Sequence, residues 1–451
     1  MTFYPAGRRF GIKALDFNSE KGEPEPEYQS LRWLTMLVPF NASTQALSVY
    51  VPLQILALGG NVVQVGFAAV VYNLALIPAP LLWGYVCDVT GRRRVIIIAG
   101  CLLLLAASMG LFLSSSVLLT IAFYALVAHS VGMLSPSVNL LLMEKVSKEE
   151  WGKGYATQNW YTFIGQIAGS ATGIPWVLYL PLHTFAGACA GFSAASAVMA
   201  ALLVHDAKVA VERRAMVLTA QGFLARISQI PLIFLRLPKY SDFVSVLRSA
   251  RQSLTRELPV IFLASMLFNA SANLFFTSYT PYLKQNNLSD SSIFFLSMYI
   301  IIVNATVSRV IIQRFKGGVS HLTASNALLF RSLGMMVAAA LAIFVFGQGV
   351  FFTTLLVYTM LGSAFVYINV NLNTLLFKAL PPGKQGGMLG VWSSFNGAAL
   401  LIGALASGFI SYYLGYSITF FAASILILTS SIILDSYYGV ARSVLSVEPE
   451  G

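Results

Sequence analysis

One stretch of this sequence concentrates charge between two long apolar runs. Residues Gly84 to Arg94 read Gly-Tyr-Val-Cys-Asp-Val-Thr-Gly-Arg-Arg-Arg, so that Asp88 stands close to three arginines. Glu144 follows at the end of a later apolar run. Carboxylates and guanidinium groups at this spacing can form ion pairs that hold helix ends together and can break again. Because the flanking runs are uncharged, the stretch predicts a loop at a membrane face.

Two further ionisable residues, His129 and Arg331, lie well within apolar runs. An ionised side chain is costly in hydrocarbon. For Arg331 we expect a side chain that extends along its helix to the polar membrane surface. For His129 two interpretations stay open: a neutral, hydrogen-bonded histidine, or a residue that takes up a proton, since an unperturbed histidine has a pKa of about 6.5. Apart from Glu144 and Asp435 at run ends, the apolar runs contain no Asp or Glu.

Amide side chains form a third group within the apolar runs. In two runs the amides lie four residues apart, so each pair shares one helix face. An amide that faces lipid is costly, so these side chains should face other helices or a cavity. For any single amide, a hydrogen bond between helices is as good an interpretation as contact with a ligand. The amides that we expect to line a polar cavity are Asn41, Gln45, Asn139, Asn269, Asn273 and Asn371.

The composition places the chain among membrane proteins. Hydrophobic residues make up 57% and charged residues 10% of the 451 residues, and the mean hydropathy is +0.75, which excludes an ordinary soluble globular protein. The net charge of +11 is better explained by membrane topology than by nucleic-acid binding. The three cysteines lie in or beside apolar runs and read as small buried side chains. We therefore expect no disulfide framework, no metal site and no cofactor.

Twelve apolar runs are long enough to cross a hydrocarbon layer of about 30 Å at 1.5 Å per residue. If the amino terminus is cytoplasmic, 26 of the 28 Lys and Arg residues fall in cytoplasmic segments or, for Arg309, near the cytoplasmic end of a run. This distribution predicts that both termini are cytoplasmic. The fold class predicted is thus an all-α polytopic membrane protein with twelve transmembrane helices. The runs cover about 33–57, 62–83, 95–113, 117–143, 155–180, 184–204, 259–283, 291–312, 322–346, 350–377, 388–413 and 417–434.

The connections divide the chain into two bundles of six helices each. Residues 31–204 form the first bundle and residues 259–436 the second. The long connection 205–258 is the cytoplasmic linker, and its residues 239–256 have apolar side chains at helical spacing, typical of an amphipathic helix on the membrane surface. Residues 1–30 are expected to be a flexible cytoplasmic tail, and residues 437–451 a second cytoplasmic tail.

The two bundles carry traces of an internal duplication. Phe40-Asn41-Ala42-Ser43 recurs as Phe268-Asn269-Ala270-Ser271, and further matches follow in the same order at nearly the same offset. Each half has an even number of spans, so the copies share one orientation and are related by an axis along the membrane normal.

Glycines spaced four residues apart mark the fifth run, at Gly165, Gly169 and Gly173, with Pro175 after them. Small residues at this spacing let helices pack closely. The run also loosely resembles a glycine and proline element of drug antiporters, although Ile174 replaces one glycine. Both interpretations stay open.

The pattern Gly84-x-x-x-Asp88-x-x-Gly91-Arg92-Arg93 between the second and third runs resembles the signature loop of the major facilitator superfamily of secondary transporters. Val89 replaces the arginine that usually follows the aspartate. The resemblance implies that Asp88 and Arg92 brace the two halves on the cytoplasmic side, within a gating cluster that we assign to Gly84, Asp88, Gly91, Arg92, Arg93 and Glu144. It also implies that runs one, four, seven and ten line a central cavity.

We therefore expect a secondary active or facilitative transporter that moves a small solute by alternating access, in either drug or metabolite efflux or solute uptake. No enzyme is implied. A membrane-embedded transferase or a non-transporting sensor is the alternative from another class. The expected partners are a small-molecule substrate and the lipid bilayer, without nucleic acid, for a monomer in the cell membrane. If transport is proton-coupled, His129 is the candidate protonation site.

Overall fold

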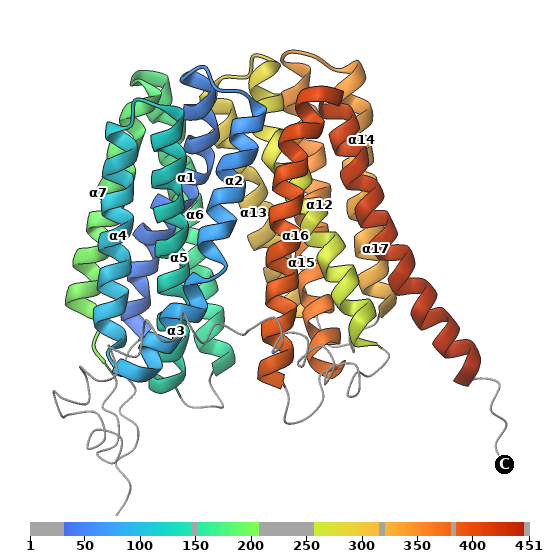
Figure 1. The fold of residues 1–451 in the computed structure, drawn as a ribbon, viewed down its shortest axis with the longest axis horizontal. Coiled ribbons are helices and arrows are strands. Elements are labelled where there is room, and N and C mark those ends of the chain that lie inside the picture. The colour runs from blue at the N-terminus through green and yellow to red at the C-terminus, as the bar shows by residue number, and fades with distance from the viewer. Residues whose placement is uncertain (1–30, 147–150, 207–256, 315–320, 380–384, 446–451) are drawn as a thin grey trace, which may run out of the picture. The chain divides into compact units, whose positions relative to one another are not determined.

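The computed structural model describes residues 31–146, 151–206, 257–314, 321–379 and 385–445, all within one compact unit. Within these ranges every regular element is a helix (Figure 1). Nine of the described helical segments are long and apolar enough to cross a membrane. The all-α class predicted from the sequence is confirmed. The amino-terminal tail and the amphipathic helix expected in the linker lie outside the described residues.

Thirteen α-helices and two short 3-10 helices make up the described ranges. Each predicted apolar run except the second corresponds to one α-helix, and η1 forms the start of the first run. The last helix continues well past the predicted run end at Leu434. The bounds in the first half are η1 Leu31–Met36, α1 Leu37–Ala57, α2 Val62–Leu76, α3 Ala79–Thr90, α4 Arg93–Leu113, α5 Val117–Lys145, α6 Trp151–Tyr179, η3 Leu182–Thr184 and α7 Phe185–Leu203. Those in the second half are α12 Leu258–Gln285, α13 Asp290–Arg314, α14 His321–Phe344, α15 Gly349–Ala379, α16 Gln385–Leu414 and α17 Tyr416–Leu445.

The second apolar run is not one continuous helix, which corrects the prediction. It is broken between α2 and α3, where Pro78 and Pro80 have no backbone N–H to continue the helical hydrogen bonds. The loop expected to begin at Gly84 is also mostly helical, because α3 continues to Thr90. Gly91 then ends α3 with a φ of 66°, a left-handed conformation that glycine adopts readily.

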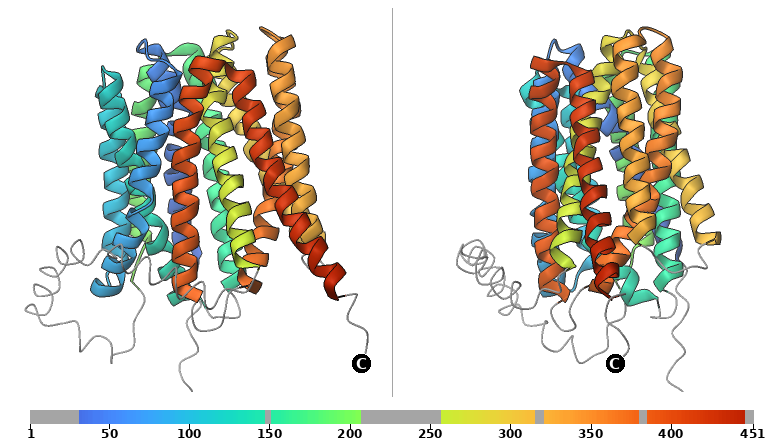
Figure 2. Two further views of the ribbon diagram at one scale, coloured as in Figure 1. Left: turned by 45° about the vertical axis from the view of Figure 1, so that its right-hand side comes forward. Right: turned by 90° about the vertical axis from the view of Figure 1, so that its right-hand side faces the viewer.

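The helices of the two halves pack in the same pairs. In the first half α1 packs against α6 and α7, and α4 packs against α5 and α7. In the second half α12 packs against α16 and α17, and α14 packs against α15 and α17. Across the halves α2 packs along α16, and α6 packs along α13. These pairs can be followed in the views of Figures 1 and 2.

Close contacts of glycine support the same correspondence. A Cβ on Gly169 of α6 would lie 2.1 Å from the carbonyl oxygen of Ala42. A Cβ on Gly403 of α16 would lie 2.3 Å from the carbonyl oxygen of Ala270. Ala42 and Ala270 hold the same position in the repeated tetrapeptide. The glycine spacing in the fifth run thus serves close packing of α6 on α1, the first of the two interpretations.

Glycines also lie at the two most extensive contacts between the halves. At the contact of α2 with α16, a Cβ on Gly66 would lie 3.0 Å from the Cα of Gly408. At the contact of α6 with α13, a Cβ on Gly173 would lie 2.4 Å from Cδ1 of Phe294. The first contact therefore brings two backbones together, and the second seats an aromatic ring on a glycine.

Candidate functional site

A cavity of about 370 Å³ lies between the halves, and we call it the central cavity. Its walls come from α1, α2, α5, α12, α13 and α15, toward the end of these helices that is uppermost in Figure 1. In the described part of the chain no Asp, Glu, Lys, Arg or His side chain lines it. Its polar lining residues are Gln45, Ser48, Tyr72, Asn73, Tyr124, Asn273, Thr277, Thr280, Ser297 and Tyr358.

Amide side chains in the wall of the central cavity form hydrogen bonds to neighbouring helices. Gln45 Nε2 on α1 donates a hydrogen bond of 3.1 Å to Ser297 Oγ on α13, and so joins the two halves. Asn273 Nδ2 on α12 donates to the carbonyl oxygen of Leu400 on α16, at 3.0 Å. These contacts fix the amide groups at the cavity wall, and each amide keeps further hydrogen-bonding capacity with which it can bind a ligand.

Aromatic rings supply flat surfaces to the same cavity. The rings of Tyr72 and Tyr124 lie 4.6 Å apart between centroids, at an angle of 35°. On the opposite side, Phe276 lies 6.2 Å from Tyr358 between ring centroids. A site with amides, hydroxyl groups and ring faces can bind a small polar molecule that has an apolar surface of its own.

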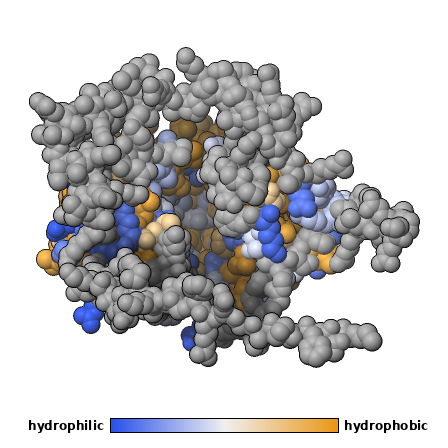
Figure 3. Space-filling model, turned by 90° about the horizontal axis from the view of Figure 1, so that it is seen from below, coloured by the Kyte–Doolittle hydropathy of each residue, from blue (hydrophilic) through white to orange (hydrophobic). Residues whose placement is uncertain are grey.

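A second, smaller cavity of about 280 Å³ lies nearer the opposite helix ends, and we call it the lower pocket. The break between α2 and α3 forms one wall, and α12, α15 and α16 form the others. Asn269, Asn369, Asn373 and Asn396 line it together with Trp392. From below, this face is hollowed near its centre, and hydrophobic residues are visible in the hollow (Figure 3).

The six amides predicted to line a cavity separate into two groups. Gln45 and Asn273 line the central cavity, and Asn269 lines the lower pocket. The other three line neither cavity: Asn41, Asn139 and Asn371.

These three amides make contacts typical of packing. Asn41 Nδ2 donates to the carbonyl oxygen of Leu37 in its own helix, at 2.8 Å. Asn139 Oδ1 on α5 accepts a hydrogen bond of 3.1 Å from Gln158 on α6. Asn371 is 0% exposed, and its Oδ1 has no hydrogen-bond partner among the described residues.

Sequence reasoning missed several lining residues. Asn73, which is 7% exposed, lies in the second apolar run and could have been found by the same rule as the other amides. Tyr72, Tyr124 and Tyr358 could not, because an aromatic residue in an apolar helix is as typical of the core as of a cavity wall.

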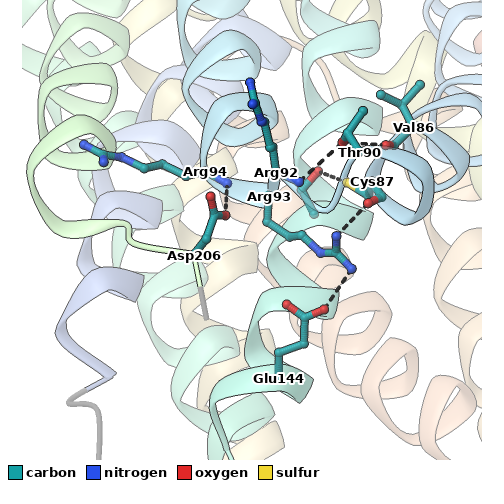
Figure 4. A network of polar contacts seen from close by, with 9 residues as sticks. Val86, Cys87, Thr90, Arg92, Arg93, Arg94, Glu144 and Asp206 are labelled. Atoms are coloured by element: carbon teal, nitrogen blue, oxygen red, sulfur yellow. Dashed lines mark hydrogen bonds and ion pairs between the residues drawn. The ribbon is translucent and has the colours of Figure 1, made fainter. Parts of the chain in front are cut away.

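The expected gating cluster is built around Arg93, as Figure 4 shows. Its Nη2 lies 2.8 Å from Glu144 Oε1 at the end of α5, and its Nη1 donates to the carbonyl oxygen of Cys87 in α3, at 2.6 Å. Arg93 is 9% exposed, so one guanidinium joins α3, α4 and α5 at a partly buried site. All three helices belong to the first half.

The other members of the cluster lie around this ion pair. Arg92 is exposed, and its backbone N–H donates to Thr90 Oγ1 at 3.4 Å. Gly84 lies within α3, where a Cβ would be 3.8 Å from Pro136 Cβ. Asp88 belongs to α3, and its side chain lies outside the described residues.

Arg94 adds a contact that the sequence did not predict. Its backbone N–H donates to Asp206 Oδ1 at 2.8 Å, and its Nη2 donates to the carbonyl oxygen of Ala201 at 2.7 Å. The carboxylate of Asp206 thus lies at the amino-terminal end of α4, where the helix dipole favours negative charge.

His129 on α5 lines neither cavity. Its Nε2 accepts a hydrogen bond of 3.0 Å from Trp83 Nε1 on α3. An imidazole can accept at this nitrogen only while the nitrogen carries no proton. The contact corresponds to the first of the two interpretations, a neutral, hydrogen-bonded histidine. The histidine is the acceptor of this hydrogen bond.

Arg331 on α14 does not extend to the membrane surface, which corrects the expectation. It is 1% exposed, and its Nη1 donates to the carbonyl oxygen of Leu361 on α15, at 2.8 Å. Its guanidinium packs against aromatic rings, which take the place of water.

Comparisons with known proteins agree with this architecture. A family model described as Major Facilitator Superfamily matches residues 34–386. A structure that concerns substrate recognition in proton dependent oligopeptide transporters is 13% identical, with a TM-score of 0.68 over 92% of this chain and 98% of that chain. A peptide transporter POT in complex with alafosfalin is 16% identical, with a TM-score of 0.66 over 91% and 93%. The nucleoside transporter NupG is 14% identical, with a TM-score of 0.63 over 91% and 98%. Comparison with curated proteins gave no match.

Proposed function

Because the chain belongs to the Major Facilitator Superfamily, we propose that it is a secondary active or facilitative transporter of a small polar solute. It is a multi-pass membrane protein. We propose twelve spans in two bundles, residues 31–204 and 259–436, with α2 and α3 together as one broken span. We further propose that both termini and the linker 205–258 are cytoplasmic in a protein of the cell membrane.

The observation that supports transport most strongly is the position of the central cavity. Helices of both halves line it, and Gln45 of α1 reaches Ser297 of α13 across it. In alternating access, the two halves rock around a site of this kind, which becomes open to one side and then to the other. The hydrogen bond between Gln45 and Ser297 is one that a bound solute can replace when the halves move.

The lining favours a solute with polar groups and a flat or apolar part, because amides and hydroxyl groups alternate with tyrosine and phenylalanine rings. The peptide and nucleoside transporters named above have the same fold, which leaves the solute of this chain to experiment. Drug or metabolite efflux and solute uptake are equally compatible with the cavity, and so is coupling to protons.

A ligand screen followed by flux measurement tests the proposal. The purified full chain is heated with panels of small solutes, since a ligand that binds the folded state raises its thermal midpoint. We expect a solute whose shift is lost in Gln45→Leu and in Asn273→Leu, while the midpoints of both variants without ligand stay near that of the parent. Asn41→Leu is the matched comparison because Asn41 lies on α1 but lines neither cavity.

The same solute is then followed into vesicles that contain the protein. Transport that stops in Gln45→Leu supports the proposal. A ligand that binds the parent but crosses no faster than in empty vesicles would instead identify a sensor. A ligand shift that both cavity variants retain would place the binding site elsewhere.

A further inference from the structure

Arg331 lies inside a cage of aromatic rings in the second half. Its Cζ is 5.2 Å from the ring centroid of Phe268 and 5.7 Å from that of Phe276, both on α12. On α15, the ring centroid of Phe365 is 5.6 Å from the same carbon. The hydrogen bond from Nη1 to Leu361 holds the guanidinium in this place.

No carboxylate within the described ranges neutralises Arg331. The ion pairs in those ranges join Arg93 to Glu144 and Lys284 to Asp290. The buried Nε of Arg331 also has no hydrogen-bond partner there. Aromatic rings attract a cation through their quadrupole but carry no net charge. The positive field of Arg331 therefore extends beyond its cage.

The rings of this cage are also walls of the two cavities. Phe276 lines the central cavity, and Phe268 lines the lower pocket. One layer of aromatic rings thus separates the guanidinium from each cavity, and no Asp or Glu in the described part of the chain lines either one. At about 10 Å and an effective dielectric constant of about 20, a unit charge changes the local concentration of a singly charged solute by about ten-fold.

We propose that Arg331 is a charge-selectivity residue, which makes both cavities favour uncharged and anionic solutes and disfavour cations. The consequence for the substrate rests on the proposed transport function. The electrostatic potential itself does not, because it acts on any charged molecule that enters the cavity.

Two thiol reagents of opposite charge measure this potential without a known substrate. Thr277, next to Phe276 in the chain and part of the central cavity wall, is replaced in the full chain as Thr277→Cys. The detergent-purified protein reacts with sulfonatoethyl methanethiosulfonate, an anion, or with trimethylammonium-ethyl methanethiosulfonate, a cation. The ratio of the two rates reports the local potential, because any change in thiolate fraction affects both reagents equally. The three native cysteines are buried and give the background rate.

Ser115→Cys is the matched control, since Ser115 is exposed between α4 and α5 and outside both cavities. We expect the ratio of anionic to cationic rates to be at least about ten-fold higher at Thr277→Cys than at Ser115→Cys. Adding Arg331→Gln, which can still donate to Leu361, should lower the ratio at Thr277→Cys by a similar factor, whereas Arg331→Lys should preserve it.

Equal ratios at the two cysteine positions, or a ratio that Arg331→Gln leaves unchanged, would overturn the proposal. If Arg331→Gln does not fold, as judged by gel filtration, the comparison between the two cysteine positions still decides whether the central cavity has the expected positive potential. Because the reagents need no transport, a chain that moves no solute contradicts only the proposed function and leaves this result intact.

Discussion

At the scale of single residues, amide side chains have different roles according to the helix face that they occupy. Gln45 reaches across the central cavity to Ser297, whereas Asn371 is fully buried and donates to its own helix, at Tyr367. The sequence predicted both as cavity residues because both are amides in apolar runs. A membrane helix is apolar toward lipid and toward its neighbours, so hydrophobic periodicity does not indicate which face meets a cavity.

His129→Gln tests whether this histidine carries a proton during transport. Glutamine can accept the hydrogen bond from Trp83 Nε1 but does not titrate between pH 5 and 8. If transport is coupled to protons through His129, the variant in vesicles with an imposed pH gradient should exchange solute at about the parent's rate and lose the accumulation that follows the gradient.

Trp83→Phe is the control for the hydrogen bond, because it removes the donor and keeps the histidine. Accumulation is measured first for the parent, since a facilitative carrier shows none. A His129→Gln protein that still accumulates solute in response to the gradient, as the parent does, would show that His129 is a structural acceptor.

At the scale of helices, the glycine contacts decide how closely neighbours approach. Gly169→Ala places a methyl group against the carbonyl oxygen of Ala42, and a backbone atom cannot move aside without shifting α1. We expect a loss of about 1–3 kcal/mol of stability, seen as a lower thermal midpoint in detergent. Gly191→Ala on α7 is the matched control, because no atom lies within 4 Å of its Cβ position. Equal midpoints for the two variants would contradict the packing role of Gly169.

Arg93 joins Glu144 at the end of α5 to the carbonyl oxygen of Cys87 in α3, and the break before α3 forms part of the lower pocket. Glu144→Gln removes the negative charge and leaves a partly buried guanidinium, at a cost of about 1–3 kcal/mol. We expect α3 to loosen and the lower pocket to open. The measurement is the rate at which a cysteine at the exposed Ser393→Cys, in that pocket, reacts with a maleimide.

Further variants show whether the charged residues of this cluster form a gate or only set the orientation of the chain in the membrane. Asp88→Asn and Arg92→Ala should raise the same rate if these residues take part in the gate, as the family resemblance implies. Asp435→Asn, at an exposed carboxylate on α17, should leave it unchanged. Unchanged rates in all gate variants, with normal yields of folded protein, would mean that the charges only orient the loop in the membrane.

The broken second span shows that hydropathy predicts the position of an apolar run but not a break within it. The lengths of the other runs correspond to single helices because apolar length alone sets a span. The break depends on Pro78 and Pro80, whose missing N–H groups a hydropathy window does not register. The gating stretch was predicted as a loop because of its charges, although Gly84 to Thr90 belong to α3.

At the scale of the whole molecule, the duplication seen in short sequence matches reappears as equivalent helix pairs. Several matches in the same order at nearly the same offset predicted it. In the structure, Ala42 and Ala270 of the repeated tetrapeptide each pack against a glycine, Gly169 of α6 and Gly403 of α16. The contacts between the halves could not be predicted, since they depend on which glycines of distant helices meet.

Cysteine labelling tests the orientation of this architecture in the membrane. With cytoplasmic termini, Ser115→Cys faces outward and Ser228→Cys, in the linker, faces inward. An impermeant maleimide added to intact cells should label the first and label the second only after lysis. Gly60 is a poor site for this purpose, because a Cβ there would lie 2.7 Å from the carbonyl oxygen of Ile55. Labelling of Ser228→Cys in intact cells would reverse the topology.

The meeting of Gly66 and Gly408 has a mechanical consequence. The two backbones touch near the start of α2 and toward the end of α16. This contact is therefore a fulcrum, that is, a fixed point about which α16 can tilt, and most of α16 lies on one side of it. From Gly408 back to the start of α16 at Gln385, the helix extends about 35 Å at 1.5 Å per residue. A tilt of roughly 10° about the fulcrum therefore moves the far end by about 6 Å, the diameter of a small solute, while the touching backbones hardly move.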